Sequence, residues 1–317
     1  MLGISRVSHI HCEFPVFCSE PSRRSRHNAV MVAAAQGAPE IRLITSDVDG
    51  TLLNSKQELT AGVEHAVKLA RSVGVPLVVA TGKAPGCAWT KSVLPRLGPP
   101  SPGVFMQGLL VFNAQGDLIH SRCMERAVID TCIDFAAQHG LTLAAYSTSR
   151  IVTEQTDEHT DRLLFYGEPT PESVGPLRAF LNAPSAAGFQ KLILMQTEER
   201  IQEIRPLAIS ALGDSATLTT ALPGMLEVLP PGASKGAGVA CLLRELNIEP
   251  HHLMAIGDGE NDVEMLQMAA VGVAVANAGA PARAAADVTL KYSNDQDAVA
   301  HAIESFVLAP RGLSMHN

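Results

Sequence analysis

Acidic, hydroxyl and amine side chains stand at four places where an apolar run of the sequence stops. These places are residues 47–51, 81–83, 234–236 and 257–262, which read DVDGT, TGK, SKG and GDGEND. Carboxylates are ligands that hard divalent cations prefer, whereas hydroxyl, amine and amide groups donate the hydrogen bonds that a phosphate needs. Together the four segments predict a site for phosphoryl transfer.

The first segment supplies two carboxylates with different predicted roles, Asp47 and Asp49. A carboxylate needs no base to become an anion, so Asp47 is the candidate nucleophile and would form an acyl phosphate that water later cleaves. Asp49 can protonate the leaving oxygen as a general acid and then activate the attacking water as a base. A calcium-binding loop is the alternative, but Leu52 stands where such a loop requires glycine, and a predicted strand rather than a helix precedes it.

Magnesium is the predicted cofactor of this site. We expect Asp258 to hold Mg²⁺ together with the Asp47 carboxylate and the Asp49 backbone carbonyl. Asp262 is either a further ligand or a support behind the others. In the alternative interpretation Asp258 lies in a Gly-Asp-Gly turn and Asp262 caps a helix. Both can hold at once, because the N-terminus of a helix also favours anions.

Four residues are predicted to bind the phosphate: Thr81, Gly82, Lys235 and Asn261. Thr81 has a hydroxyl at the end of a predicted strand, directly before Gly82, and this hydroxyl can donate to a phosphoryl oxygen. Asn261 offers an amide donor. Taken alone, Lys235 would be an exposed lysine at the start of a helix, because most lysines are solvated surface charges.

Short aliphatic runs that alternate with helical stretches predict how these side chains are positioned. The expected strands are 41–46, 75–80 and 252–257, and the expected helices are 60–73, 234–246 and 261–269. This alternation is typical of an α/β fold with a parallel sheet covered on both faces. Ligands of such sheets bind beyond the carboxyl ends of the strands, where all three acids proposed for the metal are expected to lie.

A second unit is expected between the second and third segments, because 317 residues exceed one ordinary domain. Residues 109–120 predict a hairpin, and the core is expected to resume with a strand at 225–229. Between them the pattern predicts helices and strands that contain none of the four segments. The helices are 126–139 and 198–212, with one more between 153 and 189, and the strands are 141–146, 150–153, 189–195 and 216–220.

The four segments, in this order, resemble those of the haloacid dehalogenase-like hydrolases, most of which are magnesium-dependent phosphatases. The resemblance covers residues 41–306 and is greatest to the Cof-type sugar-phosphate phosphatases of that superfamily. It implies an α/β Rossmann-like parallel-sheet core with an inserted α+β cap of type II (C2). The expected catalytic core is 39–120 and 223–317, and the expected cap is 121–222.

The resemblance also bears on single residues. It makes Lys235, just after a strand, a phosphate-binding lysine of the third motif. Lys83 departs from the family pattern, which usually has arginine after Thr-Gly, and Gln107 stands where asparagine is usual before Gly108. Both departures can alter positioning or the choice of substrate. Neither changes the four carboxylates of the predicted site.

Composition limits the classes of partner. The formal net charge of -8 argues against a nucleic-acid surface, which needs clustered Lys and Arg. No apolar stretch approaches the roughly 20 residues that a membrane helix needs. The expected partner is a small phosphate ester, bound locally.

Residues 1–38 differ from the rest of the chain. They contain four arginines and five serines with only two acids, followed by a run of small apolar residues, and they lack the apolar block of a secretory signal. This composition resembles a transit peptide and predicts the plastid stroma as the location. The alternatives are a mitochondrial location, or a disordered, untargeted leader on a cytoplasmic protein.

The expected function is magnesium-dependent hydrolysis of a small phosphomonoester through an aspartyl-phosphate intermediate. The resemblance suggests a sugar phosphate or a phosphorylated cofactor, such as a flavin or pyridoxal phosphate. A phosphomutase shares this chemistry and is the alternative among enzymes. A catalytically silent binding protein on the same fold is the alternative from another class. A nucleotide-binding dehydrogenase is disfavoured, because no G-x-G-x-x-G follows the first strand.

Overall fold

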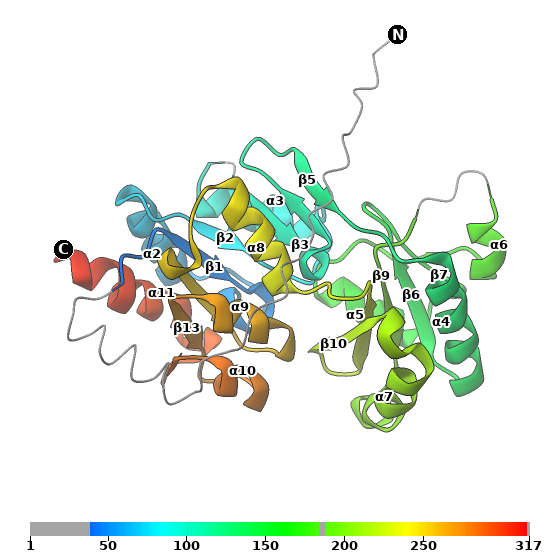
Figure 1. Ribbon diagram of the computed structural model, residues 1–317. Helices are drawn as coiled ribbons and strands as arrows, with labels where there is room; N and C mark the ends of the chain where they lie inside the picture. The colour runs from blue at the N-terminus through cyan, green and yellow to red at the C-terminus, as the bar shows by residue number, and fades with distance from the viewer. Residues whose placement is uncertain (1–38, 100, 184–187, 316–317) are drawn as a thin grey trace, which may run out of the picture.

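The computed structural model describes residues 39–99, 101–183 and 188–315. These residues form two units, each built on its own sheet, that lie side by side in Figure 1. The leader predicted for residues 1–38 lies outside the described residues. In the described part of the chain, no helix combines the length and the apolar character that crossing a membrane requires.

A parallel sheet of five strands forms the centre of the first unit, in the order β14-β13-β12-β1-β2. Its strands are β1 (Leu43–Ser46), β2 (Leu77–Val79), β12 (Leu253–Gly257), β13 (Val271–Ala274) and β14 (Val288–Thr289). Strand β1 pairs with β12 on one side and with β2 on the other. The three predicted strands are therefore neighbours with their carboxyl ends at one edge, which confirms the predicted Rossmann-like α/β core.

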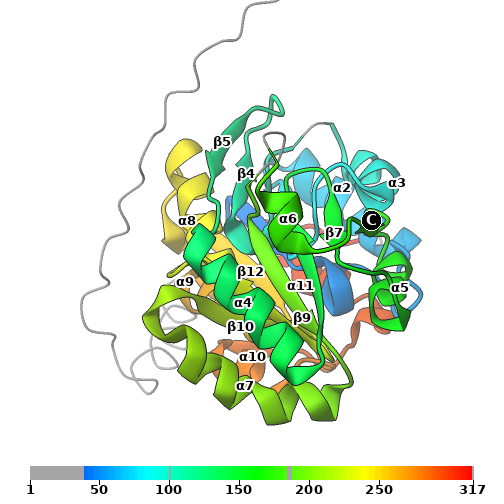
Figure 2. The same cartoon turned by 90° about the vertical axis from the view of Figure 1, so that its right-hand side faces the viewer.

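Helices pack around this sheet (Figures 1 and 2). They are α2 (Ala61–Ser72), α3 (Ala88–Leu97), α8 (Lys235–Glu245), α9 (Val263–Met268), α10 (Ala280–Ala285) and α11 (Ala298–Ile303). Helix α2 begins after Thr60, whose hydroxyl accepts a hydrogen bond from the backbone N–H of Val63 at 3.2 Å. The sequence pattern predicts α2, α8 and α9 but not α3, α10 or α11. Helix α3 contains Pro95, a residue that usually ends a helix.

A small antiparallel sheet adjoins the core. It consists of β3 (Gly103–Phe105), β4 (Leu110–Phe112) and β5 (Leu118–Ser121), and β4 and β5 form the hairpin predicted for residues 109–120. A parallel bridge between Ala80 and Val104 joins β3 to the segment that follows β2.

The second unit is a six-stranded sheet with helices, in the strand order β10-β11-β9-β6-β7-β8. Its strands are β6 (Thr142–Tyr146), β7 (Ile151–Thr153), β8 (Glu172–Ser173), β9 (Lys191–Met195), β10 (Thr217–Leu222) and β11 (Met225–Leu229), and its helices are α4 (Arg126–His139), α5 (Glu158–Phe165), α6 (Leu177–Leu181) and α7 (Glu198–Leu212). Figure 2 shows α4 and α7 together on the face turned away from the first unit. This unit is the α+β cap.

The boundary predicted between cap and core at residue 223 is wrong, because β11 belongs to the cap sheet. It pairs antiparallel with β9 and with β10, and all five of its residues are buried. A strand buried on both faces reads in sequence like a core strand of a parallel sheet, so the sequence could not assign it to one unit. The core resumes after Leu229.

Candidate active site

The first two predicted acids follow the central strand β1. The backbone N–H of Asp47 donates to the carbonyl of Ile256 in β12 at 2.9 Å, so the parallel ladder continues past the strand end. The chain then turns at Gly50, which has a φ of 74°. A Cβ at this glycine would lie 2.5 Å from Oδ2 of Asp258. The close approach brings the loops after β1 and β12 together, which requires a residue without a side chain.

Lys235 joins two of the carboxylates at the centre of the site. Its Nζ lies 2.6 Å from Oδ1 of Asp47 and 2.8 Å from Oδ1 of Asp262, and all three side chains are buried. Burial raises the pKa of Asp47 well above its usual value, against the opposing effect of Lys235. Burial also acts against the charge of Lys235, but Asp262 and Asp47 outweigh it and raise the lysine pKa. Lys235 is thus charged inside the site, not an exposed surface lysine.

Asp258 completes an acidic cluster with Asp47 and Asp262, in which one carboxylate oxygen of each lies within 4.8 Å of the others. The hydroxyl of Thr51 donates to Oδ1 of Asp258 at 2.6 Å. Burial, followed by repulsion from Asp262, raises the pKa of Asp258 to about 6. A divalent cation would relieve this repulsion, and the carboxylates of Asp47 and Asp258 supply hard oxygen donors of the kind that fit Mg²⁺.

The hydrogen bonds of Asp262 indicate a supporting position. Its Oδ2 accepts from the backbone N–H groups of Asp258 at 3.0 Å and Gly259 at 2.9 Å, while its Oδ1 pairs with Lys235. Both oxygens therefore have protein partners that fix the loop holding Asp258. This geometry favours the second of its two predicted roles, a support behind the metal ligands.

Asp49 is paired with the lysine that departs from the family pattern. Nζ of Lys83 lies 2.9 Å from Oδ1 of Asp49, and the same ammonium donates to the backbone carbonyl of Tyr166, just after cap helix α5. Lys83 is buried. The candidate general acid is thus linked through one core lysine to the cap.

Thr81 and Gly82 follow β2, the other neighbour of β1. The hydroxyl of Thr81 accepts from the backbone N–H of Lys83 at 3.1 Å, which closes a tight turn. A Cβ on Gly82 would lie 2.6 Å from Nε2 of Gln107. Gln107 has a φ of 58° and accepts from the Asn261 amide at 3.1 Å, so the two loops that are predicted to bind phosphate meet through this side chain.

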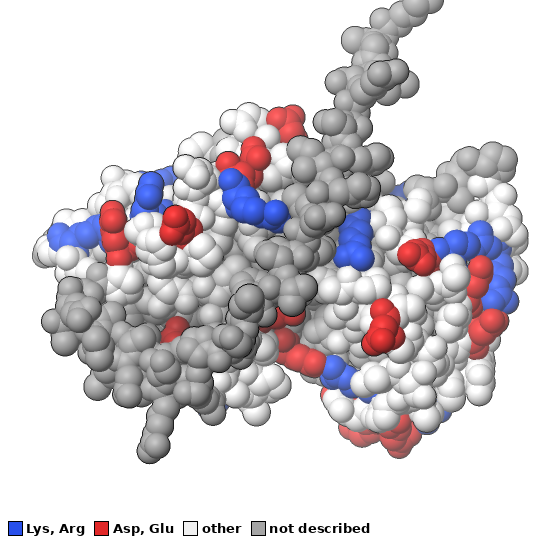
Figure 3. Space-filling model, viewed as in Figure 1, with Lys and Arg blue, Asp and Glu red and all other residues white. Residues whose placement is uncertain are grey.

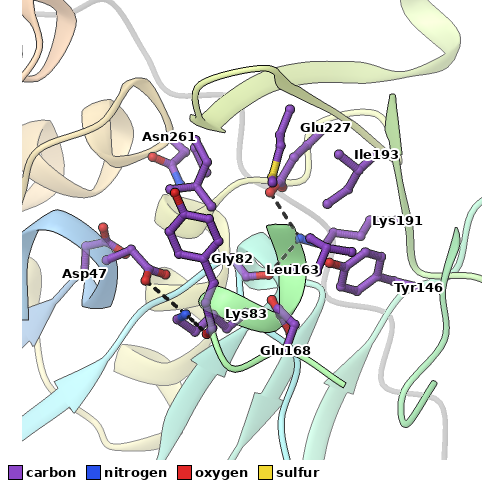
Figure 4. A pocket seen from close by; sticks show the side chains of 15 residues that line it. Asp47, Gly82, Lys83, Tyr146, Leu163, Glu168, Lys191, Ile193, Glu227 and Asn261 are labelled. Carbon is purple, nitrogen blue, oxygen red and sulfur yellow. Dashed lines mark hydrogen bonds and ion pairs between the residues drawn. The ribbon is translucent and has the colours of Figure 1, made fainter. Parts of the chain in front are cut away.

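The structure also shows cap residues at the site that the sequence interpretation missed. A cavity between the two units is lined by Asp47 and Asp49 on the core side and by cap residues on the other (Figure 4). The charged cap residues among them are Glu168, Lys191 and Glu227. A signal for two of them was available, because Lys191 and Glu227 are single charges within otherwise apolar strands.

Besides the contact of Lys83 with Tyr166, three further pairs of residues join the cap to the core. Lys191 donates to the carbonyl of Gly82 at 2.8 Å, and the backbone N–H of Ala84 donates to Glu168 at 3.1 Å. Arg205 of α7 pairs with Glu260 through two hydrogen bonds, one of 2.8 Å. Burial raises the pKa of Glu168 to about 7, against the opposing charges of Lys191 and Lys83.

Comparison with known proteins decides the family. The family model described as haloacid dehalogenase-like hydrolase matches residues 44–303, which is most of the chain. The chain belongs to this family.

Two curated relatives illustrate the range of this similarity. The chain is 41% identical over 275 residues to a protein of Arabidopsis thaliana named "Endoribonuclease YBEY, chloroplastic"; the match covers 84% of this chain but only 46% of the Arabidopsis protein. It is 28% identical over 284 residues to the phosphatase YwpJ of Bacillus subtilis, with 82% of this chain and 98% of YwpJ covered. The second match extends over both the core and the cap.

Solved structures agree in fold. A HAD/COF-like hydrolase from Plasmodium vivax has a TM-score of 0.77 at 23% identity, covering 88% of this chain and 97% of its own. The protein SMU.1108c from Streptococcus mutans has a TM-score of 0.74 at 25% identity, covering 84% and 99%. The resemblance to the Cof-type members of the haloacid dehalogenase-like hydrolases is confirmed.

Proposed function

We propose that this haloacid dehalogenase-like hydrolase is a magnesium-dependent phosphatase that cleaves a small phosphomonoester through a phosphorylated Asp47. The observation that carries the proposal is the cluster of Asp47, Asp258 and Asp262 around the buried ammonium of Lys235, at the carboxyl ends of β1 and β12. Relatives that the chain matches almost end to end are named phosphatases, in agreement with this class of enzyme.

The two residues proposed for the chemical steps, Asp47 and Asp49, both line the cavity. Asp47 attacks phosphorus, and Lys235 holds the Asp47 carboxylate in position through the 2.6 Å contact with Oδ1. Asp49 donates a proton to the leaving alcohol and later accepts one from the attacking water. The donors of Thr81, Gly82 and Asn261 bind the phosphoryl oxygens. Mg²⁺ held by Asp47, Asp258 and the Asp49 carbonyl would supply charge neutralisation at the phosphate.

The proposed substrate is a sugar phosphate or a phosphorylated cofactor or cofactor precursor. Two relatives point to the second class, an HMP-PP phosphatase at 25% identity and a 5-amino-6-(5-phospho-D-ribitylamino)uracil phosphatase at 24% identity. A fold neighbour described as a sugar phosphatase points to the first. The cavity is closed over by the cap, which suits a compact ester and exclusion of bulk water.

The surface charge is consistent with a small-molecule substrate. On the face shown in Figure 3, the visible Lys and Arg side chains are scattered singly or in small groups, several beside Asp or Glu. The proposed location is the plastid stroma, from the composition of residues 1–38 and from the word "chloroplastic" in the name of the Arabidopsis relative.

Phosphate release from a broad panel of phosphomonoesters in the presence of Mg²⁺ tests the proposal. Asp47→Asn should lower the rate roughly 10³-fold or more with an unchanged unfolding transition, because the amide keeps the shape but cannot attack phosphorus. Asp161→Asn, on the exposed surface of cap helix α5, is the matched control. A wild-type rate in Asp47→Asn protein would show that the nucleophile is another residue.

The same assay separates the two alternatives. A phosphomutase would convert a sugar phosphate into an isomer with little free phosphate, so product analysis distinguishes it from a phosphatase. A silent binding protein would bind an ester, seen as a raised unfolding temperature, without releasing phosphate from any member of the panel.

A further inference from the structure

The cap sheet turns alternate residues toward the core. In β9 and β11, Leu192, Leu194, Leu226 and Val228 belong to the apolar cluster that includes α4 and α7. The residues that alternate with them along the two strands, such as Ile193 and Met225, pack with the apolar cluster of the core. Because side chains of a strand alternate between its faces, Lys191 and Glu227 also face the core and the cavity.

Lys191 and Glu227 form a buried pair at the end of the cavity opposite Asp47 (Figure 4). Ile193 lies directly across from Glu227 in the antiparallel ladder, which places Lys191 on its diagonal. Lys191 Nζ lies 3.1 Å from Oε1 of Glu227, and both residues are at most 4% exposed. The pair is thus built into the wall of the site.

Two of the three N–H donors of Lys191 are used by the protein itself. One N–H goes to the carbonyl of Gly82 and another to Glu227, and the ammonium lies 4.5 Å from the centre of the Tyr146 ring. In the described part of the chain, by contrast, no group donates to Oε2 of Glu227, although this atom is buried. Buried carboxylate oxygens are almost always hydrogen-bonded, so this oxygen, in a residue that lines the cavity, is an acceptor without a donor among the described residues.

The surroundings define what can enter. Leu163, Ile193 and Met225 supply apolar contacts in the same cavity, and Asp47 and Asp49 line the other side, where phosphoryl transfer is proposed. A leaving group attached to that phosphate would therefore extend toward Glu227. It would find apolar walls and one unpaired acceptor.

We infer that Glu227 is a specificity-determining residue, whose Oε2 accepts a hydrogen bond from a hydroxyl or ring N–H of the leaving group. Lys191 is its positioning residue. The inference rests on the proposed phosphatase activity and deepens it, because it states which leaving groups are favoured. Esters with a donor at this place are preferred, and esters with a carboxylate or second phosphate there are rejected by the charge of Glu227.

The test compares two kinds of ester in the full chain with Mg²⁺. Glucose 6-phosphate, ribose 5-phosphate and pyridoxine 5′-phosphate carry donors on the leaving group, whereas p-nitrophenyl phosphate carries none. Glu227→Gln should lower kcat/KM for the best donor-bearing ester roughly 10- to 100-fold, because its amide keeps an oxygen for Lys191 and turns an NH₂ toward the cavity. The value for p-nitrophenyl phosphate should change less than about threefold.

Two further variants complete the design. Glu172→Gln, on exposed strand β8 of the cap, removes a charge at a distance and should leave the ratio between the two kinds of ester unchanged. The double variant Lys191→Met with Glu227→Leu removes both buried charges together, which is often neutral for stability, and it should show the same loss of selectivity. This variant keeps the test valid if Glu227→Gln fails to fold.

The possible results distinguish failure of the Glu227 inference from failure of the proposed phosphatase function. Equal loss on all esters would mean that the pair is only structural, and no loss on any ester would mean that Oε2 holds water and nothing else; either result overturns the inference. If the wild-type chain releases no phosphate even from p-nitrophenyl phosphate, the proposed function fails instead. The shift of the unfolding temperature by the same esters then still measures whether Glu227 selects donors.

Discussion

Lys83 of the core holds the carboxylate of Asp49, with 2.9 Å between Nζ and Oδ1, while the same ammonium donates to a backbone carbonyl of the cap. One buried lysine thereby connects the candidate general acid to the closed position of the cap. The departure from arginine at this position of the family pattern does not remove the positive charge.

Replacement of Lys83 should therefore impair catalysis more than folding. Lys83→Met keeps most of the length of the side chain but leaves Asp49 without its partner, and kcat/KM should fall roughly 10-fold or more. Lys83→Arg should retain most activity. Lys91→Met, at an exposed position of α3, is the control for loss of one lysine. Equal rates for Lys83→Met and Lys91→Met protein would remove Lys83 from the mechanism.

Removal of magnesium should abolish phosphate release, and added Mg²⁺ should restore it, because the proposed ligands are hard oxygens. Asp258→Asn should raise the Mg²⁺ concentration for half-maximal activity at least about tenfold, since a carboxylate binds a divalent cation far better than an amide. Full activity in excess EDTA would contradict the metal site. Titration of both proteins with Mg²⁺ gives the measurement.

Gly50→Ala should displace the Asp258 carboxylate, because the added methyl group would clash with it. The new methyl group would lie 2.5 Å from Oδ2 of Asp258, and the backbone φ of 74° adds a strain of about 1 kcal/mol for a residue with a side chain. Gly116→Ala is the matched control, because its φ is 85° but nothing lies within 4 Å of its Cβ position. We expect both variants to lose stability, and only Gly50→Ala to lose most of its activity. Equal activities would show that the loop tolerates the shift.

The raised pKa of Glu168 predicts a pH dependence of stability. The pKa rises from 4.5 to about 7 on folding, so the folded state binds the proton more tightly than the unfolded state does. The resulting stabilisation is complete below about 4.5 and is lost as pH rises through about 7. Glu168→Gln cannot lose a proton, so its unfolding temperature should rise relative to the wild type across this range in metal-free buffer. Glu158→Gln, on the exposed first turn of α5, should show no such trend, and a constant difference for Glu168→Gln would contradict the prediction.

A chain that begins at Pro39 should fold and keep its activity, because the first core residue of the sheet region is Ile41 and no proposed site residue precedes Asp47. Residues 1–38 are proposed to act as a transit peptide that directs the protein to plastids. A fluorescent protein fused behind them should enter plastids of plant or algal cells. A signal confined to the cytosol would speak against that role.

Local pattern was sufficient for the three strands of the core that carry the site, β1, β2 and β12. The runs before Asp47, Thr81 and Asp258 are short and aliphatic, and a parallel sheet is the arrangement that buries such runs on both faces. Their polar ends therefore had to meet at one edge, which the pairing of β1 with β12 and β2 bears out. The sequence pattern assigned β11 to the wrong unit, because an apolar strand has the same pattern whether it is buried in the core sheet or in the cap sheet.

The sequence by itself determined the class of chemistry, because the acids and donors of Asp47, Asp49, Asp258 and Lys235 are read from residue type and from their place after strands. Only the tertiary structure decided how these groups are paired and what faces them. The contact of Lys83 with Asp49 joins residues that are 34 positions apart in the chain. The surroundings of the unpaired Glu227 oxygen depend on how the cap packs on the core. Such contacts depend on how two units pack, and no local pattern records the packing between distant segments.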